Sequence, residues 1–310
     1  MALYNYLGNI LHLTPFTSVK DYGAVGDGVN DDSYAIQDAL DAIGSSGGNV
    51  LFPTGTYLIE NGVRFYSNQF IIFEAGAVLK QGAAIDNLMR SYCNSAITGY
   101  NGVHDVIIFG GTFDGGSFTT NNTLLGMAHS QNIIVANCIF KNAYGTWHDL
   151  EINSSYNVKV LNCDFEGSRK TGANGEMIQI DGAGSATYYP WDSINIDNTV
   201  CKYVDVSGCI FHNSSVAPGI GNHSNMAHQY VRVFDNKFIG LTSSRGAINF
   251  VSNMTDIDIY DNTFDSCTTA IASEGSTYYI YDNRFNSVTT PIYGTDSIAH
   301  NNMINGTYTA

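Results

Sequence analysis

The stretch VLNCDF at residues 160–165 recurs along the chain with small changes, and this recurrence decides the fold. Its counterparts all end in phenylalanine: VANCIF (135–140), VSGCIF (206–211), VFDNKF (233–238), IYDNTF (259–264), IYDNRF (280–285) and, more loosely, IFGGTF (108–113). The phenylalanines are separated by 27, 25, 46, 27, 26 and 21 residues. A self-similar period in the twenties is typical of a solenoid, in which each coil buries its apolar face against its neighbours.

The position two residues before each phenylalanine changes from cysteine to asparagine along the chain. The residues at this position are Cys138, Cys163, Cys209, Asn236, Asn262 and Asn283. Stacked coils place equivalent residues about 4.8 Å apart. We therefore expect an internal cysteine stack that continues as an asparagine ladder, beside a stack of the phenylalanines. No two of the six cysteines form a CxxC pair, so we expect free, buried thiols and no metal site built on them.

The N-terminal part contains one amphipathic helical pattern. Residues 30–43, NDDSYAIQDALDAI, have an apolar stripe at helical spacing and aspartates that can cap a helix. An exposed solenoid end needs a cover, and this helix is suited to that task. Strands expected at 49–59 and 70–80 follow without a linker. We predict one all-β domain over residues 19–310 with this short capping α-helix, preceded by an arm, residues 1–18, that carries a short helix.

The charge balance limits the partners. The chain has 28 acidic and 13 basic residues and a net charge of −15. Such a chain is not expected to bind nucleic acid or an anionic membrane, and a strongly polyanionic substrate is disfavoured. No apolar run approaches the roughly 18 residues of a membrane span, and residues 1–16 lack the basic and small-residue features of a signal peptide.

The opening of the chain resembles a known family. VKDYGAVGDGVNDDSYAIQDAL (19–40) and GGNVLFPTGTYLI (47–59) are similar to the first coils of the pectate-lyase-like superfamily, which includes polygalacturonases and phage tailspike depolymerases. The resemblance implies a right-handed parallel β-helix and an activity on polysaccharides.

Four further motifs resemble glycosidase-like β-helix proteins of Gram-positive bacteria and prophages. They are HDLEIN (148–153), GEMIQID (175–181), CKYVDVSGCIF (201–211) and GIGNHS (219–224). The DxD, DD and GHG pattern of polygalacturonases is absent, so the reaction has to be inferred from the residues themselves.

Aligning the strands by their inward apolar residues predicts a polar patch on one outer face. Leu150, Ile178, Ile220, Ile248, Ile271 and Ile292 are expected to stack inside. Because neighbours in a strand alternate faces, the outer patch contains Asp149, Glu151, Gln179, Asp181, His223 and Asn249. Glu176 is expected beside His148 of the previous coil. We expect Asp181 to face solvent in a groove walled by the long insertion 183–200, which carries Tyr189 and Trp191.

This patch suggests glycoside hydrolysis, which uses two carboxylates. Asp181 and Glu176 are the leading acid/base candidates, with Glu151 and Asp149 as partners across the coil step. Glu151 and Asp181 are expected about 8 Å apart, within the inverting range. The expected substrate-binding residues are His223, Gln179, Asn249, Arg245, Trp191, Tyr189 and His148. The alternative role for the carboxylates is structural, as acceptors for backbone amides.

Two other functions stay open on the sequence. A polysaccharide lyase would need a basic residue and calcium or positive charge, and acidic residues could hold calcium; otherwise we expect no metal and no cofactor. A non-catalytic carbohydrate-binding or adhesin module would use the same groove. The expected partner is a polysaccharide, the expected location is a phage virion or the extracellular space, and a homotrimer is expected if the chain is a tailspike.

Overall fold

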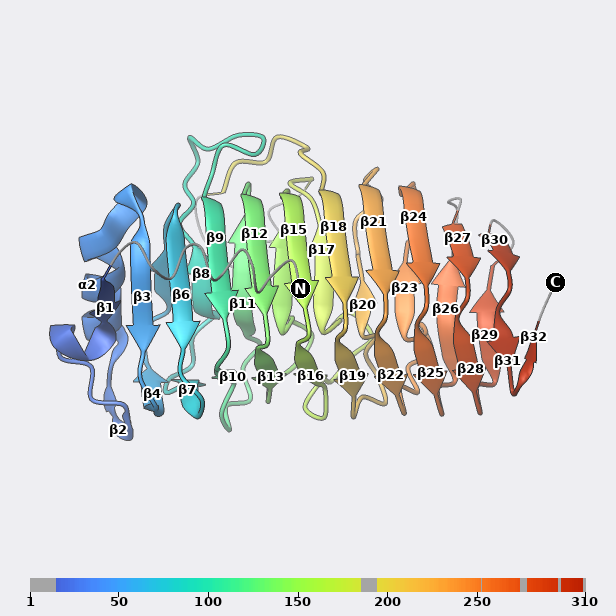
Figure 1. Cartoon of the computed structure of the whole chain (residues 1–310), viewed down its shortest axis with the longest axis horizontal. Helices are drawn as coiled ribbons and strands as arrows, with labels where there is room; N and C mark the ends of the chain where they lie inside the picture. Colours follow the sequence, from blue (N-terminus) through green and yellow to red (C-terminus); the bar gives the residue numbers. More distant parts are fainter. Residues whose placement is uncertain (1–14, 185–193, 252, 274–277, 295–296, 309–310) are drawn as a thin grey trace.

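The computed structural model describes residues 15–184, 194–251, 253–273, 278–294 and 297–308. The chain winds as a right-handed coil whose strands form three sheets along one long axis (Figure 1). Among the described residues every strand pair between coils is parallel, and the one antiparallel pair there, β31 with β32, lies at the C-terminal end. The predicted fold class, an all-β right-handed parallel β-helix with a short N-terminal helix, is confirmed.

Sheet A has 11 strands and forms the wall in front in Figure 1. Its strands are β1 (Phe16–Ser18), β3 (Gly48–Phe52), β6 (Gln69–Phe73), β9 (His104–Phe109), β12 (Gln131–Ala136), β15 (Tyr156–Leu161), β18 (Lys202–Ser207), β21 (Gln229–Phe234), β24 (Thr255–Tyr260), β27 (Tyr278–Tyr281) and β30 (Ser297–His300).

Sheet B has 12 short strands. They are β2 (Asp27–Asp31), β4 (Gly55–Ile59), β7 (Ala77–Gln81), β10 (Thr112–Asp114), β13 (Ile139–Lys141), β16 (Asp164–Glu166), β19 (Ile210–His212), β22 (Lys237–Ile239), β25 (Thr263–Asp265), β28 (Arg284–Asn286), β31 (Met303–Ile304) and β32 (Thr307–Tyr308).

Sheet C has nine strands and carries the predicted polar patch. They are β5 (Val63–Phe65), β8 (Asn87–Ser91), β11 (Thr123–Ala128), β14 (Leu150–Asn153), β17 (Ile178–Asp181), β20 (Ile220–Gly221), β23 (Ile248–Phe250), β26 (Thr269–Ser273) and β29 (Thr290–Tyr293).

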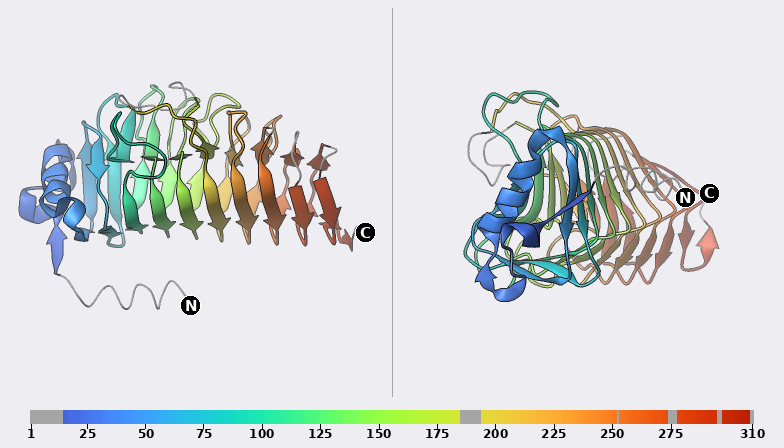
Figure 2. Two further views of the ribbon diagram at one scale, coloured as in Figure 1. Left: turned by 90° about the horizontal axis from the view of Figure 1, so that it is seen from above. Right: turned by 60° about the vertical axis from the view of Figure 1, so that its left-hand side comes forward.

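One α-helix, α2 (Ser33–Ile43), covers the N-terminal end of the coil (Figure 2). It buries Ile36, Ala39 and Leu40 against the first coils, as expected of a lid. Short 3₁₀ helices, η1 (Val19–Tyr22) and η2 (Gly44–Ser46), flank it. The expected aspartate cap is present by position, but its side chain does not bond to the first turn of α2. Asp32 occupies the cap position, but its carboxylate accepts hydrogen bonds from the backbone N–H groups of Val25 and Gly26 instead.

The two strands expected at 49–59 and 70–80 are each split into two. Residues 53–54 and 74–76 turn the chain, so β3 and β6 lie in sheet A while β4 and β7 lie in sheet B. The helix expected in the arm 1–18 falls largely on residues outside the described ones, although residues 16–18 pair with β3. No helix in the described part of the chain is long and apolar enough to span a membrane.

The phenylalanine repeat forms a continuous stack inside the coil. Ring centroids are 4.8 Å apart for Phe140–Phe165 and Phe211–Phe238, and 5.1 Å apart for Phe264–Phe285. The complete stack contains Phe113, Phe140, Phe165, Phe211, Phe238, Phe264 and Phe285, all fully buried. The spacing matches the rise of one coil, which confirms the repeat that the sequence predicts.

The cysteine stack and the asparagine ladder also form as predicted. Cys163 N–H lies 3.4 Å from Cys209 Sγ, and Cys209 N–H donates to Asn236 Oδ1 at 2.9 Å, where the cysteines give way to asparagines. From there Asn236 Nδ2 donates to Asn262 Oδ1, and Asn262 Nδ2 donates to Asn283 Oδ1, both at 3.0 Å. All six cysteines are buried free thiols.

Candidate functional site

The strand register on sheet C is the one predicted from the sequence. Leu150 pairs with Ile178, Ile178 with Ile220 and Ile220 with Ile248, and these side chains are buried inside. The next residue outward gives the row Glu151, Gln179, Gly221, Asn249, Ala272 and Tyr293. The predicted patch therefore exists as a set of neighbours on four coils.

The expectation that these carboxylates face solvent is wrong. Asp149, Glu176 and Asp181 are 0% exposed and Glu151 is 1% exposed. The segment after β20 folds over the end of β17. A Cβ placed on Gly182 would lie 2.7 Å from Met226 Sδ, which shows how closely this segment packs. The sequence does not reveal this cover, because outward-pointing residues are exposed only if nothing else packs on them.

Asp181 anchors the covering segment. Its carboxylate accepts backbone N–H bonds from Gly182 and His223 at 3.1 Å and from Ser224 at 3.2 Å. The Gln179 side-chain amide donates to it at 3.1 Å. These contacts are those of the structural alternative, in which the carboxylate satisfies backbone amides, and they fix His223 in place.

Asp149 forms a buried ion pair that the sequence reasoning missed. Its Oδ1 lies 3.4 Å from Lys170 Nζ, and both side chains are fully buried. Burial raises the pKa of Asp149 to about 6, although Lys170 opposes the shift. Burial also lowers the pKa of Lys170, whose ammonium donates to the Trp147 carbonyl at 2.7 Å. The sequence signal for this ion pair was Lys170 itself, one of the few basic residues of the chain, shortly before GEMIQID.

Glu151 is a neutral carboxyl group at neutral pH. Burial raises its pKa to about 8, and the nearby charge of Asp181 adds to the shift. Thr123 in β11 donates to Oε2 at 3.1 Å, and Asn153 donates to Oε1 at 2.9 Å. Both carboxyl oxygens therefore already have protein partners.

Glu176, which is fully buried, forms a close pair with His223, which is partly exposed. Glu176 Oε2 lies 2.5 Å from His223 Nε2, and the His223 side chain is 19% exposed. Gln179 donates to His223 Nδ1 at 3.2 Å, so Nδ1 is the acceptor and Nε2–H donates to the carboxylate. Burial lowers the pKa of His223, but the hydrogen bond and charge of Glu176 outweigh it, so that the pKa is raised.

His148 lies beside Glu176, as the sequence predicts. Its Nδ1 donates to the Glu176 backbone carbonyl at 3.0 Å and is 3.7 Å from Oε2 of the same residue. Burial lowers the pKa of His148 well below its usual value, and the charges of His223 and Lys170 act in the same direction. His148 is therefore neutral, and the hydrogen bond to the Glu176 carboxylate comes from Nε2–H of His223.

Four buried polar atoms around Gly221 have no hydrogen-bond partner among the described residues: Glu176 Oε1, Gln179 Oε1, Arg245 Nη1 and Asn249 Oδ1. Glu176 Oε1 and Arg245 Nη1 are 3.8 Å apart, too far for a direct hydrogen bond. Gly221 lets the Glu176 side chain lie over β20, since a Cβ there would be 2.8 Å from Glu176 Cγ. Native proteins leave few buried polar atoms unsatisfied, so this grouping points to a ligand.

His148, Glu176 and His223 also have the residue types of a metal site, with ligand atoms within 4.8 Å of one another. Two imidazoles and one carboxylate suit a transition metal, whereas calcium prefers a shell of oxygens. In this structure His223 Nε2 is hydrogen-bonded to Glu176, so these side chains also hold one another without a metal. The expectation that no metal is used stays a prediction.

The described part of the long insertion packs on the loop around Tyr100 and on His129, which follows β11. Tyr189 and Trp191 lie outside the described residues. Farther along the insertion, the carbonyl of Asn195 accepts from His129 Nε2 at 3.0 Å and the carbonyl of Val200 accepts from Tyr100 at 3.0 Å. Figure 1 shows the two long loops running together above the coil. The loop around Tyr100 was not predicted to contribute, because nothing in its sequence marks it.

The fold is that of a parallel β-helix protein, and a cluster of largely buried polar side chains lies on sheet C. The sequence family described as rhamnogalacturonase A/epimerase, pectate lyase-like, matches residues 16–188, more than half of the chain. The chain belongs to this family, and the resemblance drawn from its sequence is confirmed. The catalytic and binding roles given to individual residues stay predictions.

Individual relatives come from bacterial surfaces and from phages. The chain is 29% identical over 298 residues to plasmin and fibronectin-binding protein A of Streptococcus pneumoniae, covering 80% of this chain and 39% of that protein. It is 26% identical over 202 residues to the pre-neck appendage protein of Bacillus phage phi29, covering 64% of this chain and 21% of that protein. The chain thus spans less than half the length of these relatives.

A solved structure shares the fold over nearly the whole chain. The crystal structure of PfbA, a surface adhesin of Streptococcus pneumoniae, superimposes with a TM-score of 0.77 at 24% identity. The match covers 94% of this chain and 78% of the adhesin chain. At this identity the likeness establishes the architecture.

Proposed function

We propose that this chain is a polysaccharide-degrading enzyme, a glycoside hydrolase, whose substrate lies across the outer face of sheet C. The observation that carries the proposal is a group of buried polar atoms around Gly221 that have no hydrogen-bond partner in the described part of the chain: Glu176 Oε1, Gln179 Oε1, Arg245 Nη1 and Asn249 Oδ1. Sugar hydroxyls both donate and accept, so one saccharide can satisfy acceptors and a donor together. The acidic character of the chain favours a neutral or weakly charged glycan.

Glu176 and His223 are the proposed acid/base pair. Hydrolysis of a glycosidic bond requires one proton delivered to the leaving oxygen and one removed from the attacking water. One oxygen of Glu176 is held by His223, while the other is unpartnered and lies 3.8 Å from Arg245, a gap that one hydroxyl or water can bridge. In the proposed step Glu176 Oε1 takes the proton of the attacking water and passes it to the leaving oxygen. The one carboxyl group thus removes and delivers a proton, while Nε2–H of His223 stays bonded to Oε2.

The other carboxylates are proposed to support this pair. Asp181 is a positioning residue, because it holds both Gln179 and the backbone at His223. Asp149 balances the buried charge of Lys170. Glu151 is protonated at neutral pH, as the acid of a two-carboxylate pair must be, but its oxygens are bonded to Thr123 and Asn153. We therefore assign Glu151 no direct contact with the scissile bond.

The test is Glu176→Gln, assayed by release of reducing ends from purified bacterial capsular and extracellular polysaccharides. Activity is expected to fall by about 10²–10⁴-fold, the usual contribution of acid–base catalysis. The melting temperature should stay close to that of the unmodified chain, because the amide keeps the shape of the carboxylate. Glu60→Gln is the matched control, since Glu60 is exposed and precedes β5, at the N-terminal end of sheet C and far along the sheet from β17.

Two outcomes would replace this assignment. Near-full activity of Glu176→Gln on a cleaved substrate would remove Glu176 from the mechanism. Products that absorb in the ultraviolet as unsaturated uronides would identify a lyase instead.

A second candidate function is a non-catalytic binding module. The observation that favours it is the burial of all four carboxylates, together with 29% identity over 80% of the chain to a protein named for binding plasmin and fibronectin. A module would bind polysaccharide and release no reducing ends from any member of the panel. Either function fits a virion or extracellular location, and sedimentation equilibrium distinguishes the proposed homotrimer from a monomer.

A further inference from the structure

A second unusual feature lies on the outer face of sheet A, where one backbone position repeats in a left-handed conformation. The second residue of six successive long strands has φ between 55° and 58°. These residues are Asp105, Asn132, Asn157, Tyr203, Tyr230 and Asp256, in β9, β12, β15, β18, β21 and β24. The strand register aligns the preceding residues from coil to coil, so the six form one row.

Two members of this row do not suit its backbone. Asparagine and aspartate tolerate the left-handed region, whereas a bulky aromatic side chain there is a true outlier. Tyr203 and Tyr230 adopt this conformation on adjacent coils, and they are 43% and 42% exposed. Burial in a core therefore does not explain them, and strain of this kind is concentrated at functional sites.

The two rings stand together as a small aromatic surface. Tyr203 and Tyr230 stack with centroids 4.6 Å apart and an interplanar angle of 10°, and Tyr156 meets Tyr203 edge to face at 5.1 Å. The face of Tyr230 toward Asp256 has no ring partner in the part of the chain that the structure describes, because the next coil carries an aspartate in the row. We call Tyr156, Tyr203 and Tyr230 the tyrosine platform.

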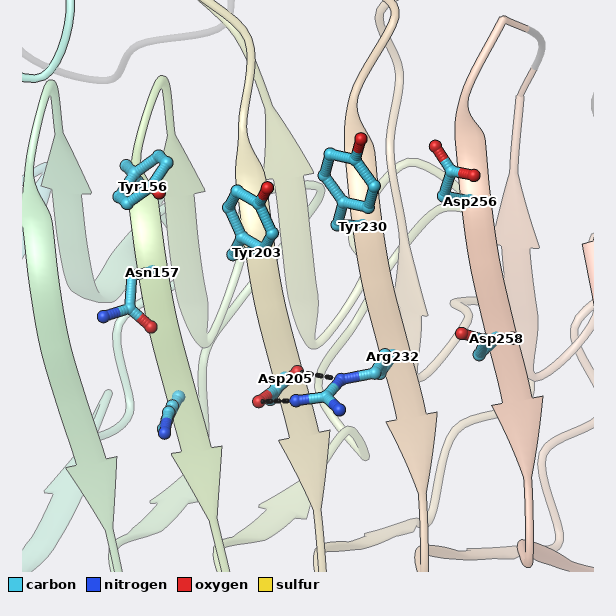
Figure 3. Close-up of a pocket in the computed structure, with 9 residues that line it drawn as sticks. Tyr156, Asn157, Tyr203, Asp205, Tyr230, Arg232, Asp256 and Asp258 are labelled. Carbon is cyan, nitrogen blue, oxygen red and sulfur yellow. Dashed lines mark hydrogen bonds and ion pairs between the residues drawn. The ribbon is translucent and has the colours of Figure 1, made fainter.

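Charged groups surround a shallow hollow beside the platform (Figure 3). Arg232 donates to both oxygens of Asp205, at 2.7 and 2.6 Å, and its side chain is 50% exposed. The hollow has a volume of about 470 Å³ and is lined by Tyr156, Asn157, Lys159, Tyr203, Asp205, Tyr230, Arg232, Asp256 and Asp258. Its size is that of a small-ligand site.

We propose that the tyrosine platform is a carbohydrate-binding site for a neutral hexose polymer. The apolar C–H face of a sugar ring packs on an aromatic surface, while its hydroxyls bond to the carboxylates and the guanidinium at the rim. Three aspartates against Arg232 and Lys159 give the site no cationic excess, which disfavours an anionic glycan. Sheet A is a separate wall from sheet C, so the site stands independently of the hydrolase proposal and would hold the polymer to the protein surface.

The test replaces both strained tyrosines by the residue that two other coils use, in the double variant Tyr203→Asn/Tyr230→Asn. Affinity is measured by native electrophoresis in gels that contain galactomannan or dextran, which present mannose, galactose and glucose units. The dissociation constant of the bound polysaccharide is expected to rise about tenfold or more, the equivalent of losing one good aromatic contact. The melting temperature should be equal or higher, because asparagine suits the left-handed backbone.

The control is Tyr34→Asn, a change of the same kind at a 70% exposed tyrosine of α2, and it should leave retardation unchanged. The proposal is overturned if the double variant is retarded as strongly as the unmodified chain, or if neither gel retards the unmodified chain. It is also overturned if light scattering shows that the double variant has lost a subunit contact while the polysaccharide gels still retard it. If only Glu176→Gln loses retardation, the polysaccharide binds on sheet C alone. If only the double variant loses it, the tyrosine platform is supported whether or not Glu176 is catalytic.

Discussion

The asparagine ladder and the outer face of sheet C are built from the same coils but treat their polar groups in opposite ways. In the ladder, each coil supplies asparagine at the same position, and each side chain bonds to the next. On sheet C, successive coils supply Glu151, Gln179, Gly221 and Asn249, and two of these side chains keep buried oxygens without partners among the described residues. Where the repeat is kept, polar groups stabilise the coil. Where it is broken, two side-chain oxygens have no partner among the described residues, and these are the groups that we propose bind a ligand.

The largest effect is expected where the repeat is complete. Asn262→Ala removes the acceptor of the Asn236 backbone and side-chain N–H groups and the donor to Val233 O and Asn283 Oδ1. Each buried group left unsatisfied costs about 1–3 kcal/mol, so the free energy of unfolding should fall by about 3 kcal/mol or more. Urea denaturation measures this loss. Asn174→Ala, at an exposed asparagine, should change it by less than about 0.5 kcal/mol.

If Asn262→Ala lowered the free energy of unfolding by less than about 1 kcal/mol, the contrast between the asparagine ladder and the outer face of sheet C would be wrong. The ladder would then be a by-product of stacking rather than a source of stability.

The same contrast explains how much of the molecule the sequence could predict. The repeats that end in Phe140 and Phe165 set the coil period, and the register of Leu150, Ile178 and Ile220 followed from strand alternation. These features depend on neighbouring coils alone, so a one-dimensional pattern contains them.

The candidate site was predicted only in outline. The sequence placed Glu176 by His148 and aligned Glu151 with Gln179. It did not show that the segment after β20 covers Asp181, nor that Lys170 pairs with Asp149. Both depend on how irregular loops return to the coil, and their lengths and directions do not repeat.

A second way to sharpen the comparison uses the pH dependence of stability. Glu151 has its pKa raised from 4.5 to about 8 by burial on the broken face. Between those values the folded chain keeps a proton that the unfolded chain has released, so stability falls as pH rises. One proton corresponds to about 1.4 kcal/mol per pH unit. Glu151→Gln removes this proton and should make the decline between about pH 5 and 7 shallower by up to that slope.

Denaturant midpoints at several pH values measure the difference between variant and unmodified chain. That difference isolates Glu151, although Asp149, with its pKa raised to about 6, acts in the same direction in both proteins. Glu60→Gln, at an exposed carboxylate, should leave the slope unchanged. An unchanged slope for Glu151→Gln would mean that Glu151 ionises normally and that the face is open to water.

The smallest effect on stability is expected for Asn249→Ala, the same substitution as Asn262→Ala made on the broken face. Asn249 Oδ1 is buried without a partner in the described part of the chain, so its removal leaves no new unsatisfied group and relieves one that already exists. The free energy of unfolding should change by less than about 0.5 kcal/mol.

Affinity of Asn249→Ala for a cleaved or bound polysaccharide should nevertheless fall by up to about tenfold, the value of one hydrogen bond to a ligand hydroxyl. Urea denaturation and affinity electrophoresis on both variants distinguish a structural asparagine from a ligand-binding one. Asn262→Ala should lose stability but keep its affinity for polysaccharide under conditions where it stays folded. If Asn249→Ala proved as destabilising as Asn262→Ala, the unpartnered atoms around Gly221 would belong to the coil and not to a ligand site.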